Sequence, residues 1–377
     1  MSGPDAMGST AEAPLGSIRP FYLPVLLSIL LMVAGLTSCS PATPIGQPCG
    51  DIPANVAAMT VDQLADSVAG AAKPHRCDPA SYNQYVTGLG NALGAASRGQ
   101  SGLPSGYDQQ IIDLLDSVPA GTARSNDERP VALSQVLAHG VYDTDFTTTI
   151  VGSVIDYWQI NRAATAGKTR VAIATGDGGY TWGQRDDPLP GLMTMLANNP
   201  AAAQQVFANT PTWNGAPGST ATVDNQPIFV SPRLAWLTSR PWNPKSSDDG
   251  VSLGQALETA TTTWRDAETT GQTSARIASQ LFALTGQNRQ AAAALPDPLK
   301  IAVAVILANY MPDVYATLFG LPDPDRPGQN LAPDFAEGYA LGNPYYDNLP
   351  AGAVVTASEF DNLMQAFGSN AAVTAGP

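Results

Sequence analysis

Residues 299–309 read LKIAVAVILAN, and apolar side chains occupy nearly every face of the helix that they would form. A helix that is apolar all round lies in the interior of a helical protein, because no face of it is suited to water. The stretch is also much shorter than the about 20 residues that cross a bilayer. It therefore predicts a helix inside a bundle.

Helical signals recur on both sides of this stretch. Thr60 is followed three residues later by Gln63, a capping box that opens an amphipathic run. Asp145 opens a longer run whose many β-branched residues also suit a strand. The runs with apolar residues at helical spacing are 81–96, 131–139, 145–160, 189–207 (broken near Pro200), 252–264, 274–284 and 357–373.

Proline-rich and glycine-rich segments separate these helices. Residues 214–227 and 322–350 are predicted to be polar loops, and residues 168–175 a short strand or an extended connector. We therefore predict a mainly α protein. Its fold is a helical bundle with long Pro/Gly-rich loops, which can pack as two helical subdomains, 58–185 and 186–377.

The N-terminal region contains an apolar run at residues 21–36 that ends in Leu36-Thr37-Ser38-Cys39. A Leu, two small residues and a Cys are typical of the cleavage box of a bacterial lipoprotein, in which the Cys receives diacylglycerol and a further acyl chain such as palmitate. The run has signal-peptide length, shorter than a membrane span. We predict a signal peptide at 1–38 and a lipidated Cys39 that anchors the protein to the outer face of the cell membrane. The alternative is one N-terminal transmembrane anchor in which Cys39 is incidental.

The other two cysteines, Cys49 and Cys77, remain as a pair if Cys39 is lipidated. An oxidising extracytoplasmic compartment favours a disulfide between them. Such a bond would join the end of a Pro-rich tether, residues 39–57, to the first helices. The alternative is two free thiols.

The composition restricts the classes of partner. The net charge is −14, so nucleic-acid phosphates would repel the chain, and nucleic-acid binding is disfavoured. Hydrophobic residues make up 44%, which is ample for a core. Charged residues make up only 13%, about half the usual share. This composition is typical of exported proteins from high-GC actinobacteria.

Catalytic signals are sparse in this sequence. It has two histidines, His75 in an expected loop and His139 before Gly140, where a cation would interact favourably with the helix dipole. We predict structural roles for both. No GxSxG, HExxH, CxxC or phosphate-loop pattern is present. Gly90 and Gly94 follow no strand, so they predict close helix packing. We expect no enzyme, no cofactor and no metal site.

Two acidic clusters could bind cations or cap turns. Asp248-Asp249-Gly250 precedes a predicted helix, and residues 323–330 alternate oxygen ligands but lack the Glu that an EF-hand needs. We interpret both as turn and cap residues.

Aromatic residues gather in the second half of the chain. Such residues can line a ligand or partner surface, although the alternative is that they belong to the core. The candidates for such a surface are Trp236, Trp242, Tyr345 and Tyr346.

Several segments resemble an uncharacterised actinobacterial family found in large proteins encoded near WXG100 / type VII (ESX) secretion and polymorphic-toxin genes. The resemblance lies in residues 192–207 (LMTMLANNPAAAQQVF), 237–257 (LTSRPWNPKSSDDGVSLGQAL), 274–281 and 308–314 (ANYMPDV), and more loosely in 132–146. It implies an all-helical fold and provides no catalytic residues.

Together these features predict a membrane-anchored cell-envelope lipoprotein that acts as a non-enzymatic interaction or scaffold protein with a protein partner, linked to type VII secretion. One alternative is a solute-binding lipoprotein with an aromatic-rich pocket. Another is a hydrolase that uses paired carboxylates.

Overall fold

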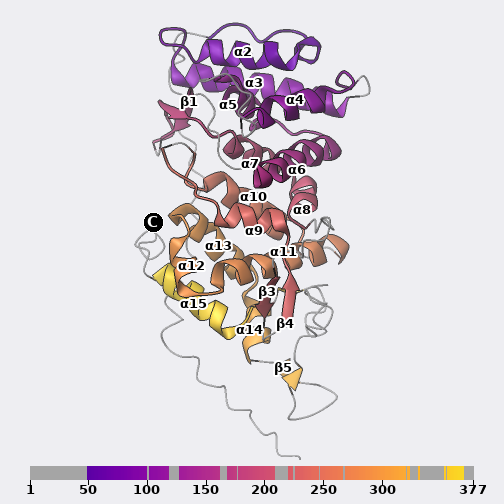
Figure 1. Cartoon of the computed structure of the whole chain (residues 1–377), viewed down its shortest axis with the longest axis vertical. Helices are drawn as coiled ribbons and strands as arrows, with labels where there is room; N and C mark the ends of the chain where they lie inside the picture. Colours follow the sequence, from indigo (N-terminus) through magenta and orange to yellow (C-terminus); the bar gives the residue numbers. More distant parts are fainter. Residues whose placement is uncertain are drawn as a thin grey trace, which may run out of the picture.

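The computed structural model is elongated and mainly helical, which confirms the predicted fold class. The first helices lie at one end of the long axis and the last helices at the other (Figure 1). The structure describes residues 49–99, 102–118, 127–161, 168–175, 177–208, 220–223, 226–245, 247–265, 268–319, 321–322, 330–331, 352–353 and 355–368.

The first part of the described chain is a group of helices that pack on one another. α2 packs against α5, α3 against α5, and α4 against α6. In chain order the elements are η1 (Val56–Ala58, a 3-10 turn), α2 (Val61–Ala71), α3 (Pro79–Arg98), α4 (Tyr107–Asp116), α5 (Arg129–Leu137) and α6 (Thr144–Ile160).

The predicted capping box at the start of α2 is confirmed. The Thr60 hydroxyl accepts a hydrogen bond from the Gln63 backbone N–H at 3.2 Å, and the Gln63 side-chain oxygen accepts one from the Thr60 N–H at 3.0 Å. These bonds satisfy backbone donors that a helix start leaves without partners.

Close packing between α3 and the end of α5 explains the glycines of α3. A Cβ atom at Gly90 would collide with the carbonyl oxygens of Val136 and His139, and one at Gly94 with the carbonyl oxygen of Val141. The prediction that these glycines allow close helix packing is therefore confirmed.

Short antiparallel hairpins interrupt the helices. β1 (Thr169–Ala174) pairs with β2 (Tyr180–Arg185), so the strand alternative for 168–175 holds. β3 (Thr220–Val223) pairs with β4 (Gln226–Phe229), and the prediction that 214–227 is only a loop is wrong. Within the other predicted loop, β6 (Asn330–Leu331) pairs with β5 (Leu321–Pro322). Backbone groups supply the hydrogen bonds of a hairpin whatever the polarity of its side chains. The polar composition of these segments therefore predicted loops, although their backbones form paired strands.

The second part of the described chain surrounds the predicted interior helix. α10 packs against both α7 and α13, and α11 packs against α15. In chain order the helices are α7 (Leu189–Ala197), α8 (Pro200–Ala208), α9 (Pro232–Ser239), α10 (Val251–Thr262), α11 (Glu268–Gly286), α12 (Arg289–Ala294), α13 (Asp297–Asn309), α14 (Met311–Phe319) and α15 (Ala357–Gly368).

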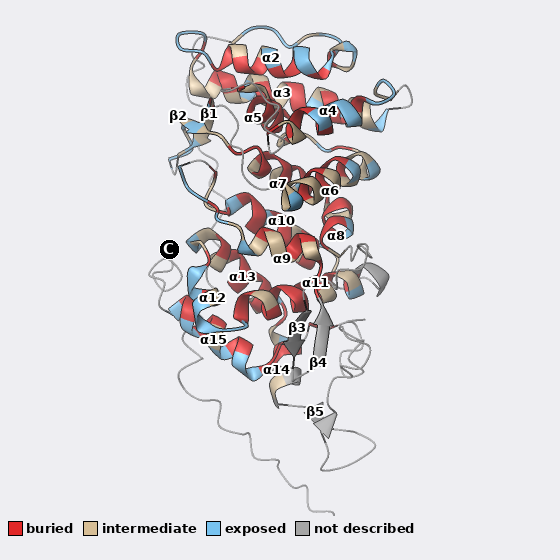
Figure 2. Ribbon diagram, in the orientation of Figure 1, coloured by how far each residue is buried: buried red, intermediate tan, exposed pale blue. Residues whose placement is uncertain are grey.

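α13 contains the sequence LKIAVAVILAN and has a largely buried surface. Leu299, Val303 and Ile306 are fully buried, whereas Val305 is partly exposed and Asn309 is exposed (Figure 2). The prediction of a helix inside the bundle is confirmed, with one edge that reaches solvent.

One hydrophobic cluster extends from Val56 to Phe367. α5 and α7 pack together across the predicted boundary between residues 185 and 186, so buried side chains of both halves form one core. The division into two subdomains stays a prediction. Among the described helices, none has both the length and the apolar character needed to cross a membrane.

Candidate functional site

A pocket of about 560 Å³ opens between α9, the segment that follows it, the end of α11, and α12. Its volume lies within the range typical of small-molecule sites. Much of its wall is apolar, including Leu284, Leu295 and Pro296. The side chains that give the pocket hydrogen-bonding and charged groups are Thr238, Ser239, Arg240, Asn243, Asp249, Thr285 and Gln287.

Local hydrogen bonds fix the turn that leaves α9. The Arg240 backbone N–H donates to the Trp236 carbonyl at 2.9 Å, and the Trp242 indole N–H donates to the Leu237 carbonyl at 2.9 Å. These bonds satisfy carbonyl groups at the end of the helix. They also place Arg240 and Trp242 side by side on the pocket wall.

Arg240 is the central cation of the site. Its Nη2 donates to an Asp187 carboxylate oxygen at 2.7 Å, and only 14% of the Arg240 side chain and 9% of the Asp187 side chain are exposed. Its guanidinium carbon lies 4.4 Å from the ring centroid of Trp242 and 5.4 Å from that of Trp236, which is cation–π geometry. Among the described residues, no group accepts a hydrogen bond from its buried Nη1.

Asp187 has a second role that holds this arrangement in place. Its other carboxylate oxygen accepts a hydrogen bond from the Leu189 N–H at 3.0 Å, at the start of α7. One carboxylate therefore joins the turn after α9 to the start of α7. Because both partners are largely desolvated, removing either would leave an uncompensated charge.

Asp249 is the anion of the pocket and has an unusual backbone conformation. Its φ is +59°, in the left-handed region that few non-glycine residues adopt. Burial raises the pKa of its carboxyl, and the nearby charges of Asp297 and Asp248 raise it further. A positive group beside Asp249 would reverse this effect.

Asp248 supports the turn rather than the pocket. Its two carboxylate oxygens accept hydrogen bonds from the Gly250 N–H at 3.1 Å and the Ser252 N–H at 2.8 Å. The prediction that this acidic cluster caps the following helix is confirmed for Asp248. The other predicted acidic cluster, 323–330, lies largely outside the described residues.

The predicted aromatic surface has a different character in the structure. Trp236 and Trp242 do come together, because both rings lie beside the Arg240 guanidinium. However, Trp242 is only 3% exposed and Arg240 covers its face, so the pair supports a cation and does not form an open aromatic platform. Tyr345 and Tyr346 lie outside the described residues. An arginine lies between two tryptophans at this helix end, in the order Trp236, Arg240, Trp242. That spacing is the sequence signal that could have identified Arg240.

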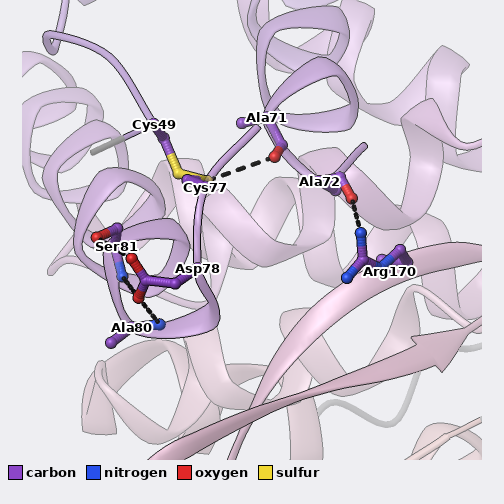
Figure 3. The surroundings of a disulfide bond; sticks show 8 residues. All are labelled: Cys49, Ala71, Ala72, Cys77, Asp78, Ala80, Ser81 and Arg170. Atoms are coloured by element: carbon purple, nitrogen blue, oxygen red, sulfur yellow. Dashed lines mark hydrogen bonds between the residues drawn. A yellow bond between two sulfur atoms is a disulfide. The ribbon is translucent and has the colours of Figure 1, made fainter. Parts of the chain in front are cut away.

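A disulfide joins Cys49, which precedes η1, to Cys77, which lies between the end of α2 and the start of α3 (Figure 3). Nearby, Arg170 of β1 donates to the Ala72 carbonyl at 3.2 Å and stacks 4.1 Å above the Trp182 ring. The hairpin thus packs on the same end of the molecule. The predicted lipidation site, Cys39, lies outside the described residues.

His139 is partly buried, and desolvation lowers the pKa of its imidazole. Its Nδ1 lies 3.3 Å from the Thr87 hydroxyl. Desolvation therefore favours the neutral ring over a cation at this helix end. His75 adopts a φ of 65° in the loop before Cys77. Within the described part of the chain, no group of three or more His, Cys, Asp or Glu side chains could hold a metal ion.

Comparison with known proteins gives one match. A model described as a family of unknown function (DUF6571) matches residues 152–356, from within α6 to the residue before α15. No curated protein and no solved structure matches the chain. The pocket residues lie inside the matched region.

Proposed function

The chain belongs to the DUF6571 family of unknown function, and on that premise we propose that it is a membrane-anchored cell-envelope lipoprotein that acts as a non-enzymatic interaction or scaffold protein. The observation that carries this proposal is the Cys49–Cys77 disulfide. It ties the chain that follows Cys39 to α2 and α3, which lie at one end of the long axis (Figure 1).

A lipid on Cys39 would place this end of the protein near the membrane. Cys39 and Cys49 are ten residues apart, with Pro41, Pro44 and Pro48 between them. An extended proline-rich chain spans about 3 Å per residue. The first helices would then lie within about 30 Å of the lipid surface. Most of the family region would face away from the membrane, where another protein of the envelope can reach it.

The sequence resemblance supports a more specific setting. Residues 192–207 and 237–257, which resemble proteins encoded near type VII secretion genes, lie in the family region. We therefore place the proposed partner among the type VII secretion or cell-wall proteins of an actinobacterial envelope.

Site-specific photo-crosslinking in cells tests this arrangement. A photoreactive amino acid is placed at exposed Gln290 in α12 or Asp361 in α15, far from the disulfide, and at exposed Asp66 in α2 as the matched membrane-side position. We expect defined protein adducts from the first two positions that are absent from the third. Adducts from none of the distal positions would contradict the proposal.

A solute-binding function is the second candidate, and the pocket beside Arg240 favours it. A ligand that binds only the folded protein raises its stability by mass action. A thermal-shift screen of amino acids, peptides, sugars and lipids tests this candidate separately from the anchor.

A further inference from the structure

We propose that the pocket between α9 and α12 binds a zwitterion of dipeptide size, whose carboxylate meets Arg240 and whose ammonium group meets Asp249. This inference rests on the second candidate function and is independent of the lipid anchor. It names the ligand class and the two side chains that select it.

Arg240 provides the carboxylate-binding group. Asp187 occupies its Nη2, while its buried Nη1 finds no acceptor among the described residues. A buried donor without an acceptor is unfavourable. Because solvent does not reach this Nη1, the guanidinium must turn within its plane before a ligand oxygen in the pocket can accept a hydrogen bond from it. The planar guanidinium suits a carboxylate, and the indole of Trp242 below it keeps its orientation fixed.

Asp249 provides the ammonium-binding group. Asp249 lines the pocket, and its backbone has a left-handed φ of +59°, which glycine would adopt without strain. Strained conformations of this kind concentrate at ligand sites. Unlike Asp248, whose two oxygens cap the next turn, Asp249 is not needed for that cap.

The charges of the site select a zwitterion over a simple anion. Among the described residues that line the pocket, Arg240 is the only cation and Asp249 the only anion. Asp187 already balances Arg240, so the site carries an excess negative charge that disfavours a purely anionic ligand. An ammonium group beside Asp249 offsets that charge.

Size and surface favour a dipeptide over a sugar. A volume of about 560 Å³ exceeds what a single amino acid fills, and Leu284, Leu295 and Pro296 provide apolar contacts for ligand side chains. A sugar ring could not stack on Trp242, because Arg240 covers the face of that indole.

Titration calorimetry of the full-length protein in detergent with L-alanyl-L-leucine tests the proposal. We expect saturable binding, and N-acetylation or C-terminal amidation of the dipeptide should each weaken it about 10–100-fold, because a charge-assisted hydrogen bond is lost. Arg240→Lys and Asp249→Asn should weaken it to a similar degree. Equal binding of the blocked peptides, or unchanged binding by both variants, would overturn the proposal.

Matched variants separate ligand binding from folding. Asp249→Gly relieves the left-handed backbone, so it should keep or raise the melting temperature while dipeptide binding is lost. His75→Gly, at the other left-handed non-glycine position, should leave dipeptide binding unchanged. Arg233→Lys, which alters the ion pair with Asp156 away from the pocket, should also leave it unchanged. Loss of binding in either control would overturn the assignment of the site.

The thermal-shift screen distinguishes failure of the ligand class from failure of solute binding. Stabilisation by an uncharged sugar or a lipid, with no heat from the dipeptide, would overturn the zwitterion and leave a solute-binding protein. Stabilisation by no compound of any class would overturn both.

Discussion

Cys49 and Cys77 close a loop of the chain that contains the whole of α2. The bond therefore fixes both the first helix and the point at which the N-terminal segment leaves the fold. A force on that segment would act on the packed helices through the disulfide. This link makes the first helices a suitable point of attachment for the region that matches the family, residues 152–356.

Removing this disulfide should destabilise the protein substantially. For a loop with a sequence separation of 28 residues, the chain-entropy model gives a loss of about 3–4 kcal/mol for Cys49→Ser. Urea unfolding with and without reductant measures it. The Cys49→Ser/Cys77→Ser double variant should lose no more than the single one, and an unchanged free energy of unfolding in both would contradict a stabilising bond.

A methyl group at Gly90 should disrupt the packing of α3 on the end of α5. It would meet the backbone oxygens of Val136 and His139, which cannot move as a side chain can. We expect Gly90→Ala to cost about 1–3 kcal/mol or more, as overpacking does.

Gly70 in α2 is the matched control for that change. A Cβ atom there meets no atom within 4 Å, so Gly70→Ala should stabilise the protein by about 0.5–1 kcal/mol through helix propensity. Thermal unfolding of both variants checks the pair. Equal shifts of the two melting temperatures would refute the packing explanation.

The buried ion pair of Arg265 and Asp313 should be far more important than an exposed one. Its atoms are 2.9 Å apart, and only 13% and 3% of the two side chains are exposed. Asp313→Asn removes a buried carboxylate charge that faces this guanidinium, which should cost about 3–5 kcal/mol. In the pair of Lys300 with Asp297, whose carboxylate side chain is 61% exposed, Asp297→Asn should cost under about 1 kcal/mol. Chemical denaturation of both variants measures the difference, and equal losses would contradict it.

Stability should depend on pH through Asp116. Burial raises the pKa of its carboxyl to about 7, and the charge of Asp113 adds to this. Because the folded-state pKa lies above the unfolded value, the stability that the protonated group contributes is complete below about pH 4 and is lost as the pH rises through about 7.

Asp116→Asn removes this titration. After a discount for the partly exposed carboxyl, the variant should gain about 1–2 kcal/mol relative to the unsubstituted protein between about pH 4 and pH 8. Urea midpoints at the two pH values measure it. A constant difference between the proteins would show that Asp116 does not titrate in this window.

Local signals predicted most of the helices. The capping box at Thr60 and the break before Pro200 depend on neighbours within one helical turn, so the sequence alone contains the information. The interior position of α13 followed from its apolar faces. The hairpins were harder, because β3 and β4 have only four residues each and arise from a pairing that composition does not reveal.

The pocket could not be predicted in the same way. Arg240, Asp249 and Leu295 come from three separate parts of the chain. They line one pocket only because α9 and α12 both pack on α11. Trp242 was identified as an aromatic candidate, but its buried position beneath Arg240 depends on the turn after α9. Sequence identified the residue type, and tertiary packing determined its role.

We predict that a lipid on Cys39 holds this protein at the membrane. Metabolic labelling with an alkyne fatty acid, followed by membrane fractionation, tests it for the full-length chain, for Cys39→Ala and for Cys49→Ser as the matched cysteine control. We predict labelled, membrane-bound protein for the unsubstituted chain and for Cys49→Ser, and unlabelled, released protein for Cys39→Ala, since acyl chains provide the membrane affinity. A Cys39→Ala protein that stays in the membrane fraction would contradict the account.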